Sequence, residues 1–328
     1  MSHKSIWKTL PRPIIGLSPM DGYTDSAFRR VCKSVNPSVL VYTEFSSADG
    51  VHHEARRVLE KFTYHPSEHP IIAQIFGKDP ETFATAAKYL EAQGFDGIDI
   101  NMGCPSKSVV RSEHGVALRK NCDRAFHLIE TVAKATSLPV SVKTRLGWSD
   151  ASDLISFGKG CENAGAQAIA IHGRTYTEPY NCPARFEPIY ELKKAVAIPV
   201  LGNGGITSIA DGKAKLDNLD GFLIGQAAIG NPWVFSEQPA PSFIEKIPLI
   251  KEHARLLFEL KGEKWAAFEV RKHLLAYVRN IPHATQYRSQ LVRVTSLTEV
   301  NAALDAIGAQ VHTESIAASQ QPIPSYAT

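Results

Sequence analysis

The sequence has no long hydrophobic run. Nowhere in its 328 residues do about eighteen apolar residues follow one another, which is the length that a membrane-spanning helix needs. The opening stretch, MSHKSIWKTLPRP, also lacks the apolar segment of a secretory signal. These absences argue against a membrane partner, and we expect a soluble chain in the cytoplasm.

Cysteine is scarce as well. The chain has five cysteines, and no two of them form a C-x-x-C pair. An odd number of widely separated thiols argues against a disulfide framework and against a zinc or iron–sulfur site, so we expect no metal. A buried free cysteine usually serves as a small hydrophobic residue. We assign this role to Cys32, Cys122, Cys161 and Cys182.

An excess of one charge is also missing. The 36 Lys and Arg against 33 Asp and Glu give a net charge of +3, which is too little to mark the whole chain as a nucleic-acid binder. A basic surface could arise only from local clustering. Hydrophobic residues make up 44% of the chain, which excludes a disordered protein and allows a sizeable core.

Eight short apolar runs, rich in valine and isoleucine, alternate with stretches long enough for a helix. The runs begin at Pro13, Val39, Pro70, Asp96, Leu138, Gln167, Ile198 and Asp220. Eight such units within roughly 230 residues fit a (β/α)8 TIM barrel, which typically has about 250. The predicted fold class is therefore α/β, with the barrel in residues 1–238.

The character of the sequence changes after the barrel. A proline-rich connector, QPAPSFIEKIP, leads into residues that have no strand pattern. Between Lys251 and Arg293, nine Lys and Arg face four Glu, a local excess of 9 − 4 = +5. We predict a small, basic, all-helical domain over residues 239–310 and a loose tail over 311–328.

Polar residues collect at the ends of the predicted strands. In a TIM barrel these carboxyl ends meet at one rim, where the active site lies. The candidates, in chain order, are Pro19, Met20, Gln74, Asn101, Cys104, Lys143, Arg145, His172, Arg174, Asn203, Gly204, Gly205, Gly225 and Gln226.

Two glycine-rich turns, LGNGGI and LIGQAAIGNP, follow the last two runs. Barrels commonly bind phosphate at this place through backbone N–H groups. The alternative is that the glycines only make tight turns. Because the two turns lie on neighbouring strands, we favour phosphate binding.

Lys143 and Cys104 are the chemically informative residues of the rim. Lys143 lies in SVKTR at a strand end, where its ammonium could stabilise negative charge on a reduced flavin. The alternative is an ammonium that simply reaches solvent. Cys104 lies between Gly103 and Pro105, in a loop. A thiol with a pKa near ~8.5 is mostly protonated at neutral pH, so it can act as a general acid or as a nucleophile.

Several motifs together resemble the bacterial type of the tRNA-dihydrouridine synthase family. They are SPMDGYTDSAFR, AQIFG, INMGCPSK, VKTRLGW, IHGRT, GNGGI, IGQAAIGNPW and VRKHLLAY, and they run in order from about Pro13 to Val278. The resemblance implies an FMN-binding barrel followed by a helical tRNA-binding domain. It also implies an enzyme that reduces specific uridines in tRNA to 5,6-dihydrouridine with NADPH.

The resemblance assigns roles to the rim residues. Hydride would pass from flavin N5 to uracil C6, and Cys104 would donate a proton to C5. Asn101 would orient the uracil. The residues implied to contact FMN are Pro19, Met20, Gln74, Lys143, His172, Asn203, Gly204, Gly205, Gly225 and Gln226.

A uridine stacked inside folded tRNA must leave the stack to reach a flavin, so cationic residues should hold the tRNA. The substrate-side candidates are Arg145, Arg174, Lys107, Arg271, Lys272, Arg279 and Arg288. The alternative for those on helices is that their charges are merely solvated. We expect the enzyme to be a monomer.

Four positions depart from the family pattern. Gln226 replaces a common arginine, which removes one charge-assisted contact to the FMN phosphate. Ala276 replaces an aromatic residue, Cys182 a common glycine, and His114 a small residue in the loop after the reactive thiol.

Two other functions stay open. An FMN barrel oxidoreductase could act on free pyrimidines or other small molecules, although such an enzyme has no use for a basic helical domain. A tRNA-binding protein with weak catalysis is the other alternative. Gln226 favours it, whereas the intact Cys104 and Lys143 oppose it.

Overall fold

The computed structural model describes residues 5–319, which fold into two compact units. The first unit contains the chain up to Ala228 together with Val234–Glu237. The second contains Ile229–Trp233 and the chain from Gln238 onward. The chain therefore passes between the two units three times between Ala228 and Gln238.

The first unit is a closed barrel of parallel strands. The strands are β1 (Ile14–Leu17), β2 (Val41–Tyr42), β3 (Ser46–Ser47), β4 (Ile71–Phe76), β5 (Gly97–Met102), β6 (Val140–Arg145), β7 (Ala168–His172), β8 (Val200–Asn203) and β9 (Gly221–Ile224). They are ordered β1-β9-β8-β7-β6-β5-β4-β2, and β3 also pairs with β4. Backbone bonds from Leu17 N to Leu40 O (2.8 Å) and from Leu40 N to Ile15 O (2.9 Å) close the ring.

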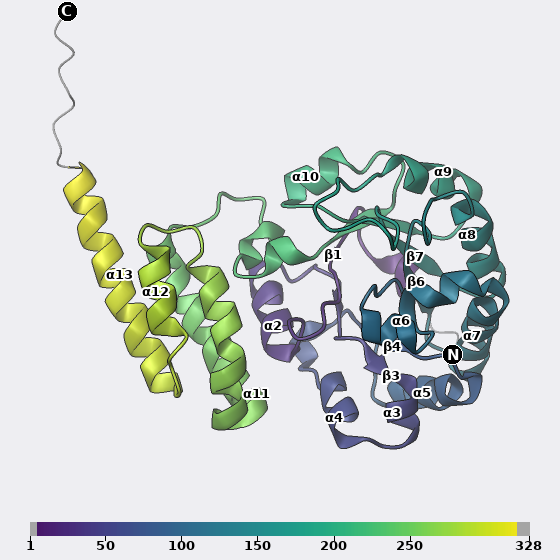
Figure 1. Ribbon diagram of the computed structural model, residues 1–328, viewed down its shortest axis with the longest axis horizontal. Coiled ribbons are helices and arrows are strands. Elements are labelled where there is room, and N and C mark those ends of the chain that lie inside the picture. The colour runs from purple at the N-terminus through teal and green to yellow at the C-terminus, as the bar shows by residue number, and fades with distance from the viewer. Residues whose placement is uncertain (1–4, 320–328) are drawn as a thin grey trace, which may run out of the picture. The chain divides into compact units, whose positions relative to one another are not determined.

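All eight predicted runs form strands of this barrel, so the predicted α/β fold class is confirmed. The second run differs in detail because β2 and β3 both pair with β4 as separate short strands. Helices surround the strands (Figure 1). They are α2 (Ser26–Val35), α3 (Ala48–His52), α4 (Arg56–Leu59), α5 (Pro80–Ala92), α6 (Lys107–Arg111), α7 (Cys122–Ala135), α8 (Leu154–Asn163), α9 (Glu187–Ala195) and α10 (Ile209–Ala214).

Side-chain alternation along the strands separates two apolar layers. Ile71, Ala73 and Ile75 of β4 belong to the large core that includes buried residues of the surrounding helices. Ile72 points the other way, into a small inner core with Leu40 and Leu223.

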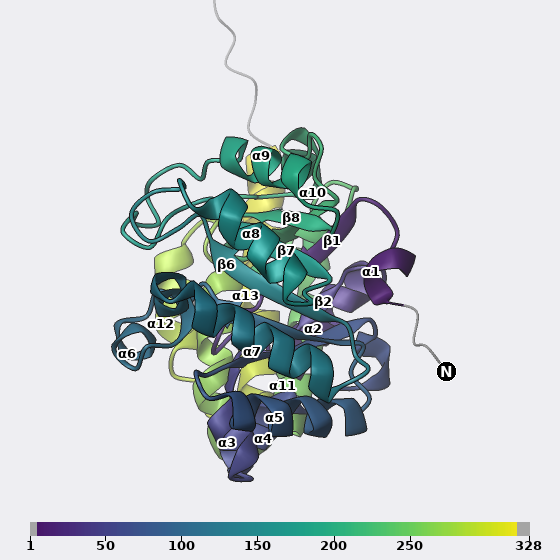
Figure 2. The ribbon, with the colours of Figure 1, turned by 90° about the vertical axis from the view of Figure 1, so that its right-hand side faces the viewer.

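Trp7 of α1 (Ile6–Thr9) also belongs to this inner core. Helix α1 lies at the opposite end of the barrel from α6 (Figure 2). The inner core therefore fills the end of the barrel nearest the strand N-termini, and polar side chains can occupy the other end.

A buried ion pair braces the first part of the barrel. Arg29 Nε lies 2.5 Å from Glu68 Oε2, and both side chains are fully buried. The other guanidinium nitrogens donate to Thr24 O (2.6 Å) and Thr63 O (2.9 Å). Glu68 also accepts from the Ser26 hydroxyl. The pair thereby joins α2 to the segment that leads into β4.

The second unit is helical, as predicted. It contains α11 (Phe243–Tyr277), α12 (Ala284–Leu291) and α13 (Leu297–Ser319). Gly262 has φ 71° and ψ 160°, so α11 is two helices that meet at this glycine. Leu257, Val270 and Leu304 are among its buried residues. The last turns of α13 fall in the stretch predicted as a tail from 311, and residues 320–328 of that stretch lie outside the described residues.

None of the helices within residues 5–319 is long and apolar enough to cross a membrane.

Candidate active site

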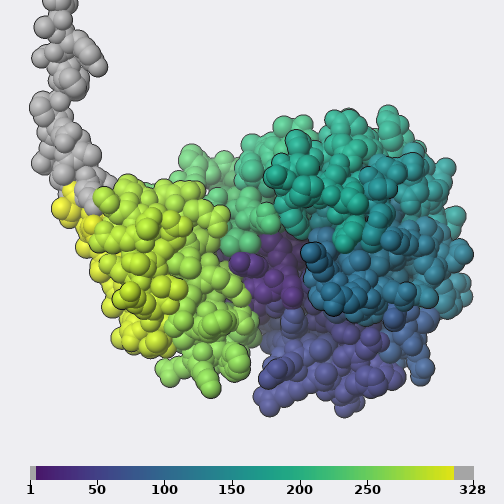
Figure 3. Space-filling view, in the orientation of Figure 1, coloured from purple at the N-terminus to yellow at the C-terminus, as the bar shows by residue number. Residues whose placement is uncertain are grey.

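The predicted rim residues of the barrel come together at the carboxyl ends of neighbouring strands. Strand register pairs Asn101 with Lys143, and His172 with Asn203. The side chains of these residues point into the barrel, and they lie nearer the carboxyl ends of the strands than the residues of the inner core do. In the space-filling view the segment around residue 110 (blue) borders a recess of this unit in which purple atoms of its N-terminal part are visible (Figure 3).

Cys104 lies in the loop after β5, and its position depends on Asn101. The Asn101 side-chain oxygen accepts from the backbone N–H of Gly103 (3.1 Å) and of Cys104 (3.0 Å). The thiol is half-buried, and burial raises its pKa above the ordinary value. The thiol therefore carries its proton at neutral pH, as a proton donor must.

Gly115 packs against the reactive loop from the other side. Its φ is 61°, and a Cβ at this position would lie 2.9 Å from Cys104 O. Any larger residue would therefore be strained and would push the loop that carries the thiol. The neighbouring His114, one of the departures from the family pattern, instead packs edge-on against Phe76, with ring centroids 5.6 Å apart.

Lys143 is the inward cation of β6. Its ammonium donates to Asn203 Oδ1 (3.1 Å), and Asn203 Nδ2 donates to Leu223 O (2.8 Å). Burial lowers the pKa of Lys143 to about 8, although the nearby Asp99 opposes this shift. A cation with a pKa so close to neutrality responds strongly to negative charge placed beside it.

His172 is a neutral imidazole. Burial, reinforced by Lys143 and two arginines, lowers its pKa to about 2. Arg174 Nη1, which can only donate, lies 3.3 Å from His172 Nε2, so the ring proton sits on Nδ1. Nδ1 is buried and has no hydrogen-bond partner within residues 5–319. It is therefore a donor that a bound ligand could satisfy.

Arg145 and Arg174 are largely engaged by the rim loops. Arg145 donates to Gly103 O (2.9 Å), Thr175 O (3.0 Å) and Tyr180 Oη (3.2 Å). Arg174 donates to Cys182 O (2.5 Å). Cys182 thus contributes its backbone carbonyl, which does not depend on the side chain. Arg145, at the end of β6, joins the loops after β5 and β7, and the contact of both guanidinium groups with substrate stays a prediction.

Among the glycines of the turns after β8 and β9, Gly205 leaves open space, whereas a Cβ on Gly204 would lie 3.0 Å from His172 Cδ2. Gly204 and Gly205 have φ values of 115° and 66°, and a Cβ on Gly205 would meet no atom within 4 Å. A Cβ on Gly225 would lie 3.5 Å from Ser18 Cβ and 3.7 Å from Met20 Sδ. The turn after β9 therefore faces the loop that carries Pro19 and Met20, and small residues keep the space between them open.

Gln226 is exposed at the start of a 3-10 turn, Gln226–Ala228, next to Gly225. The family resemblance implies FMN at this turn, and on that expectation Gln226→Arg should slow the loss of FMN, because a guanidinium adds a charge-assisted bond to a phosphate. The measurement is the flavin retained by the purified variant and the wild type through parallel dialysis. Equal retention would show that backbone groups alone hold the phosphate.

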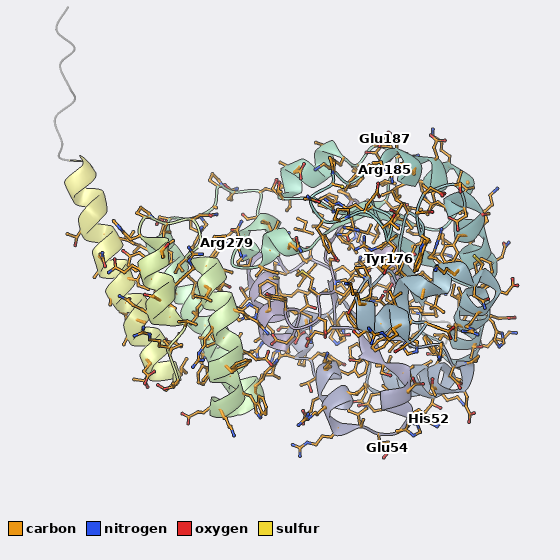
Figure 4. All side chains as sticks on the ribbon, in the orientation of Figure 1. His52, Glu54, Tyr176, Arg185, Glu187 and Arg279 are labelled. Carbon is orange, nitrogen blue, oxygen red and sulfur yellow. The ribbon has the colours of Figure 1, made fainter. Side chains whose placement is uncertain are left out.

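The substrate-side candidates outside the rim have different surroundings. Arg271 donates twice to Val294 O (3.1 and 2.8 Å), and Lys272 pairs with Glu269 (2.9 Å), so both are engaged within the helical unit and their contact with tRNA stays a prediction. Arg279 and Arg288 are exposed, and Figure 4 labels the first of them. Lys107 is exposed in α6, close in sequence to Cys104.

Asp99 belongs to the site but was not among the residues predicted for it. This carboxylate is fully buried and accepts from Gln74 Nε2 (2.7 Å) and Ser141 Oγ (2.6 Å). Burial raises its pKa to about 6. A signal was present, because strand alternation in DGIDIN places Asp99 on the same side as Asn101.

An aromatic stack at the rim was also not predicted. Trp148 and Tyr176 have ring centroids 4.2 Å apart, and Lys120 Nζ lies 3.5 Å from the Trp148 ring centroid. Figure 4 labels Tyr176. The stack joins the loops after β6 and β7. No local sequence signal could reveal it, because its members are separated by 28 residues at each step.

The family model described as dihydrouridine synthase matches residues 16–313. The chain belongs to the dihydrouridine synthase family. The match covers both units of the fold, and it confirms the predicted family and the prediction of an enzyme from it. Among the described residues of this family member, no group of three or more His, Cys, Asp and Glu is placed to hold a metal ion.

Curated relatives agree with this assignment. The chain is 36% identical over 301 residues to the probable tRNA-dihydrouridine synthase 1 of Synechocystis, covering 88% of this chain and 84% of that protein. It is 34% identical over 299 residues to tRNA-dihydrouridine synthase B of Pseudomonas aeruginosa, covering 87% and 90%. The probable tRNA-dihydrouridine synthase of Rickettsia bellii is 34% identical over 286 residues, covering 83% and 87%.

Proposed function

We propose that this dihydrouridine synthase reduces specific uridines in tRNA to 5,6-dihydrouridine, with FMN as its bound cofactor and NADPH as the reductant. The observation that carries the proposal is the half-buried Cys104 thiol, whose pKa burial raises, in a loop held by Asn101 beside a polar ring of inward residues that includes Lys143. Action in the cytoplasm as a monomer is part of the same proposal.

The residues of the ring have the chemistry that a flavin mononucleotide requires. Lys143 offers a positive charge, and His172 Nδ1 offers a buried donor that lacks a partner among the described residues. Gly205 leaves open space where a phosphate could approach backbone N–H groups. Asn203, Pro19 and Met20 would complete the set of flavin contacts. Gln74 was predicted with them, but its side chain is fully buried and its amide is engaged by Asp99 and Asn101, so its contact with flavin stays a prediction.

The chemistry requires one hydride and one proton. A bound flavin, reduced by NADPH, supplies the hydride for C6 of the uracil ring. Cys104 donates the proton that C5 takes up, which completes reduction of the C5–C6 double bond. Its burial keeps the thiol protonated until that step. A solvent proton then restores the thiol.

Asn101 has one way to contact the uracil. Its side-chain oxygen already accepts two backbone N–H groups of the Cys104 loop. One N–H of the amide nitrogen donates to Gln74 Oε1 (3.0 Å), so its second N–H is the group that remains for a substrate, and it can only donate. A uracil carbonyl is the matching acceptor, so Asn101 would orient the base relative to the thiol.

The pH dependence should follow Lys143. Its pKa is lowered to about 8, and its useful form is the cation, so the cation is lost as pH rises through about 8. We expect the rate of dihydrouridine formation to fall above that pH with a slope of about −1 on a logarithmic plot. The measurement is this rate from about pH 6 to about pH 9.5 at constant ionic strength.

Lys143→Arg is the control for this profile, because a guanidinium stays protonated throughout the range. Its activity is expected to be lower, since the group is larger, but its profile should lack the fall near pH 8. A wild-type rate that stays constant to pH 9.5 would remove Lys143 from the proposed role.

The exposed cations of the helical unit should contribute to tRNA binding. We expect Arg279→Gln and Arg288→Gln each to weaken binding, and to reduce the salt slope by about one for each phosphate that the variant no longer neutralises. The matched control is Arg255→Gln, because Arg255 is already paired with Glu252 and Glu259. Equal slopes in all three variants and the wild type would place the tRNA elsewhere.

The function itself is tested with the purified chain. Its visible spectrum is recorded, it is incubated with NADPH and unmodified tRNA, and any dihydrouridine is mapped by mass spectrometry. A yellow protein that modifies a defined position supports the proposal. A yellow protein that oxidises NADPH without changing tRNA would favour the small-molecule reductase. A colourless protein that binds tRNA even with added FMN would favour the RNA-binding alternative.

A further inference from the structure

A directed chain of hydrogen bonds leads from Asp99 to the reactive loop. Gln74 Nε2 donates to Asp99 Oδ2 (2.7 Å), and Asn101 Nδ2 donates to Gln74 Oε1 (3.0 Å). Asn101 Oδ1 then accepts from Cys104 N (3.0 Å). Two side-chain amides therefore lie between a buried carboxylate and the backbone of Cys104. In both, the NH2 group faces the Asp99 side and the oxygen faces the Cys104 side.

We infer that Asp99 is a positioning residue that sets the orientation of the Gln74 and Asn101 amides and, through them, the place of Cys104. The inference rests on the proposed function only in treating Cys104 as the reactive group. Asp99 itself contacts none of the reacting atoms in this scheme.

Each group in this hydrogen-bond chain is limited in what it can donate or accept. An ionised carboxylate only accepts hydrogen bonds, so Gln74 must turn its NH2 group toward Asp99. Its oxygen is then left for Asn101, which must donate to it. The Asn101 oxygen is thereby directed at the loop, where it meets two N–H groups. The orientation of every member follows from the carboxylate.

The reversed arrangement is unfavourable at both ends. A flipped Asn101 would place its NH2 group against the N–H groups of Gly103 and Cys104, leaving these half-buried donors without their acceptor. Gln74 and Asp99 are fully buried, so water cannot compensate. The Gln74 backbone is also held, because its N–H donates to Thr43 Oγ1 (3.0 Å). The observed orientation of the two amides can therefore be reversed only by rotation of the side chains, and not by a shift of the Gln74 backbone.

Ser141 provides the means to test the orientation separately from the charge. Its hydroxyl donates to Asp99 Oδ1 (2.6 Å), on the side away from Gln74. In Asp99→Asn, the new oxygen can still accept from Gln74 while the new NH2 group donates to the Ser141 hydroxyl, which can rotate to accept. The chain of hydrogen bonds from Asp99 through Gln74 and Asn101 to Cys104 N should survive this change. In Asp99→Asn/Ser141→Ala only Gln74 still orients the new amide, so the hydrogen-bond chain is held from the loop end alone and should be less firmly directed.

The experiment compares the full-length wild type, Ser141→Ala, Asp99→Asn, the double variant and Asp99→Leu. The first readout is the rate at which iodoacetamide alkylates Cys104, followed by peptide mass spectrometry because four other thiols are present. The second is kcat and KM for tRNA. The flavin spectrum and the thermal midpoint report whether each variant is folded and loaded.

We expect Ser141→Ala and Asp99→Asn to retain the alkylation rate within about twofold. The double variant and Asp99→Leu should alkylate several-fold faster, because the released loop exposes the thiol, and should lose kcat by up to about 10²-fold with little change in KM. The two Asp99→Asn proteins lack the same charge, so their difference reports orientation alone.

Equal alkylation rates and equal kcat in the single and double Asp99→Asn variants would overturn the inference. So would a parallel loss in Asp99→Asn and Asp99→Leu, since charge would then be the cause. If the double variant fails to fold, Asp99→Leu against Asp99→Asn decides by the same readouts. Because alkylation needs no turnover, absence of dihydrouridine in the wild type would refute the proposed function and leave this test intact.

Discussion

Cys104→Ala is expected to lower the rate of dihydrouridine formation by about 10²- to 10⁴-fold, the usual contribution of a positioned general acid. Flavin binding should persist, because the thiol is not among the groups proposed to hold the cofactor. The loop should also persist, since its anchor is the bond from the Cys104 backbone N–H to Asn101 Oδ1 and not the side chain. The measurement is single-turnover product formation by enzyme with pre-reduced flavin.

Cys122→Ala is the matched control, because it removes a half-buried thiol in α7 and should leave the rate unchanged. Loss of flavin together with activity in Cys104→Ala would show that the loop is structural. Retention of more than about a tenth of the wild-type rate would mean that another group, or water, delivers the proton.

Arg29→Met is expected to lower the free energy of unfolding by about 3–5 kcal/mol, the cost of leaving one partner of a buried ion pair behind. Glu68 would keep its charge in a fully buried place, and two backbone carbonyls would lose their donors. Urea unfolding followed by tryptophan fluorescence measures this effect, since Trp7 and Trp148 lie in the barrel unit.

The control is Arg56→Met. Arg56 pairs with Glu60 at 2.8 Å, but its side chain is 91% exposed, so its loss should change stability by no more than about 1 kcal/mol. If Arg29→Met cost no more than this control, the interior around Glu68 would have to admit water, contrary to its burial in the structure.

The barrel could be predicted because its signal is local. Each apolar run of valine and isoleucine is bounded by glycine, proline or polar residues, and burial on both faces of a parallel strand requires such continuous runs. The rule that strand ends share one rim then placed Gln74, Asn101, Lys143 and His172 together without any knowledge of contacts. The register of the sheet bears out that placement.

Other features depend on pairs that are distant in sequence. Arg29 and Glu68 are 39 residues apart, and nothing near either residue marks it as buried. Arg271 looks like a free cation in the sequence, but the fold places its guanidinium on Val294 O. Helix α13 extends to Ser319, although the sequence there suggested a loose tail. For Arg29, Glu68 and Arg271 a tertiary partner, and not local pattern, decided the role.

The sequence by itself determined the eight βα units, the family and most of the chemically capable residues, because composition and spacing act along the chain. Only the tertiary structure decided which of those residues are joined. Asp99 lies inside an apolar run, yet the barrel places it under Gln74 and beside Ser141, and this sets the direction of two amides. A hydrogen bond forms only where a donor and an acceptor meet in space at the right distance and angle, and no one-dimensional pattern contains that information.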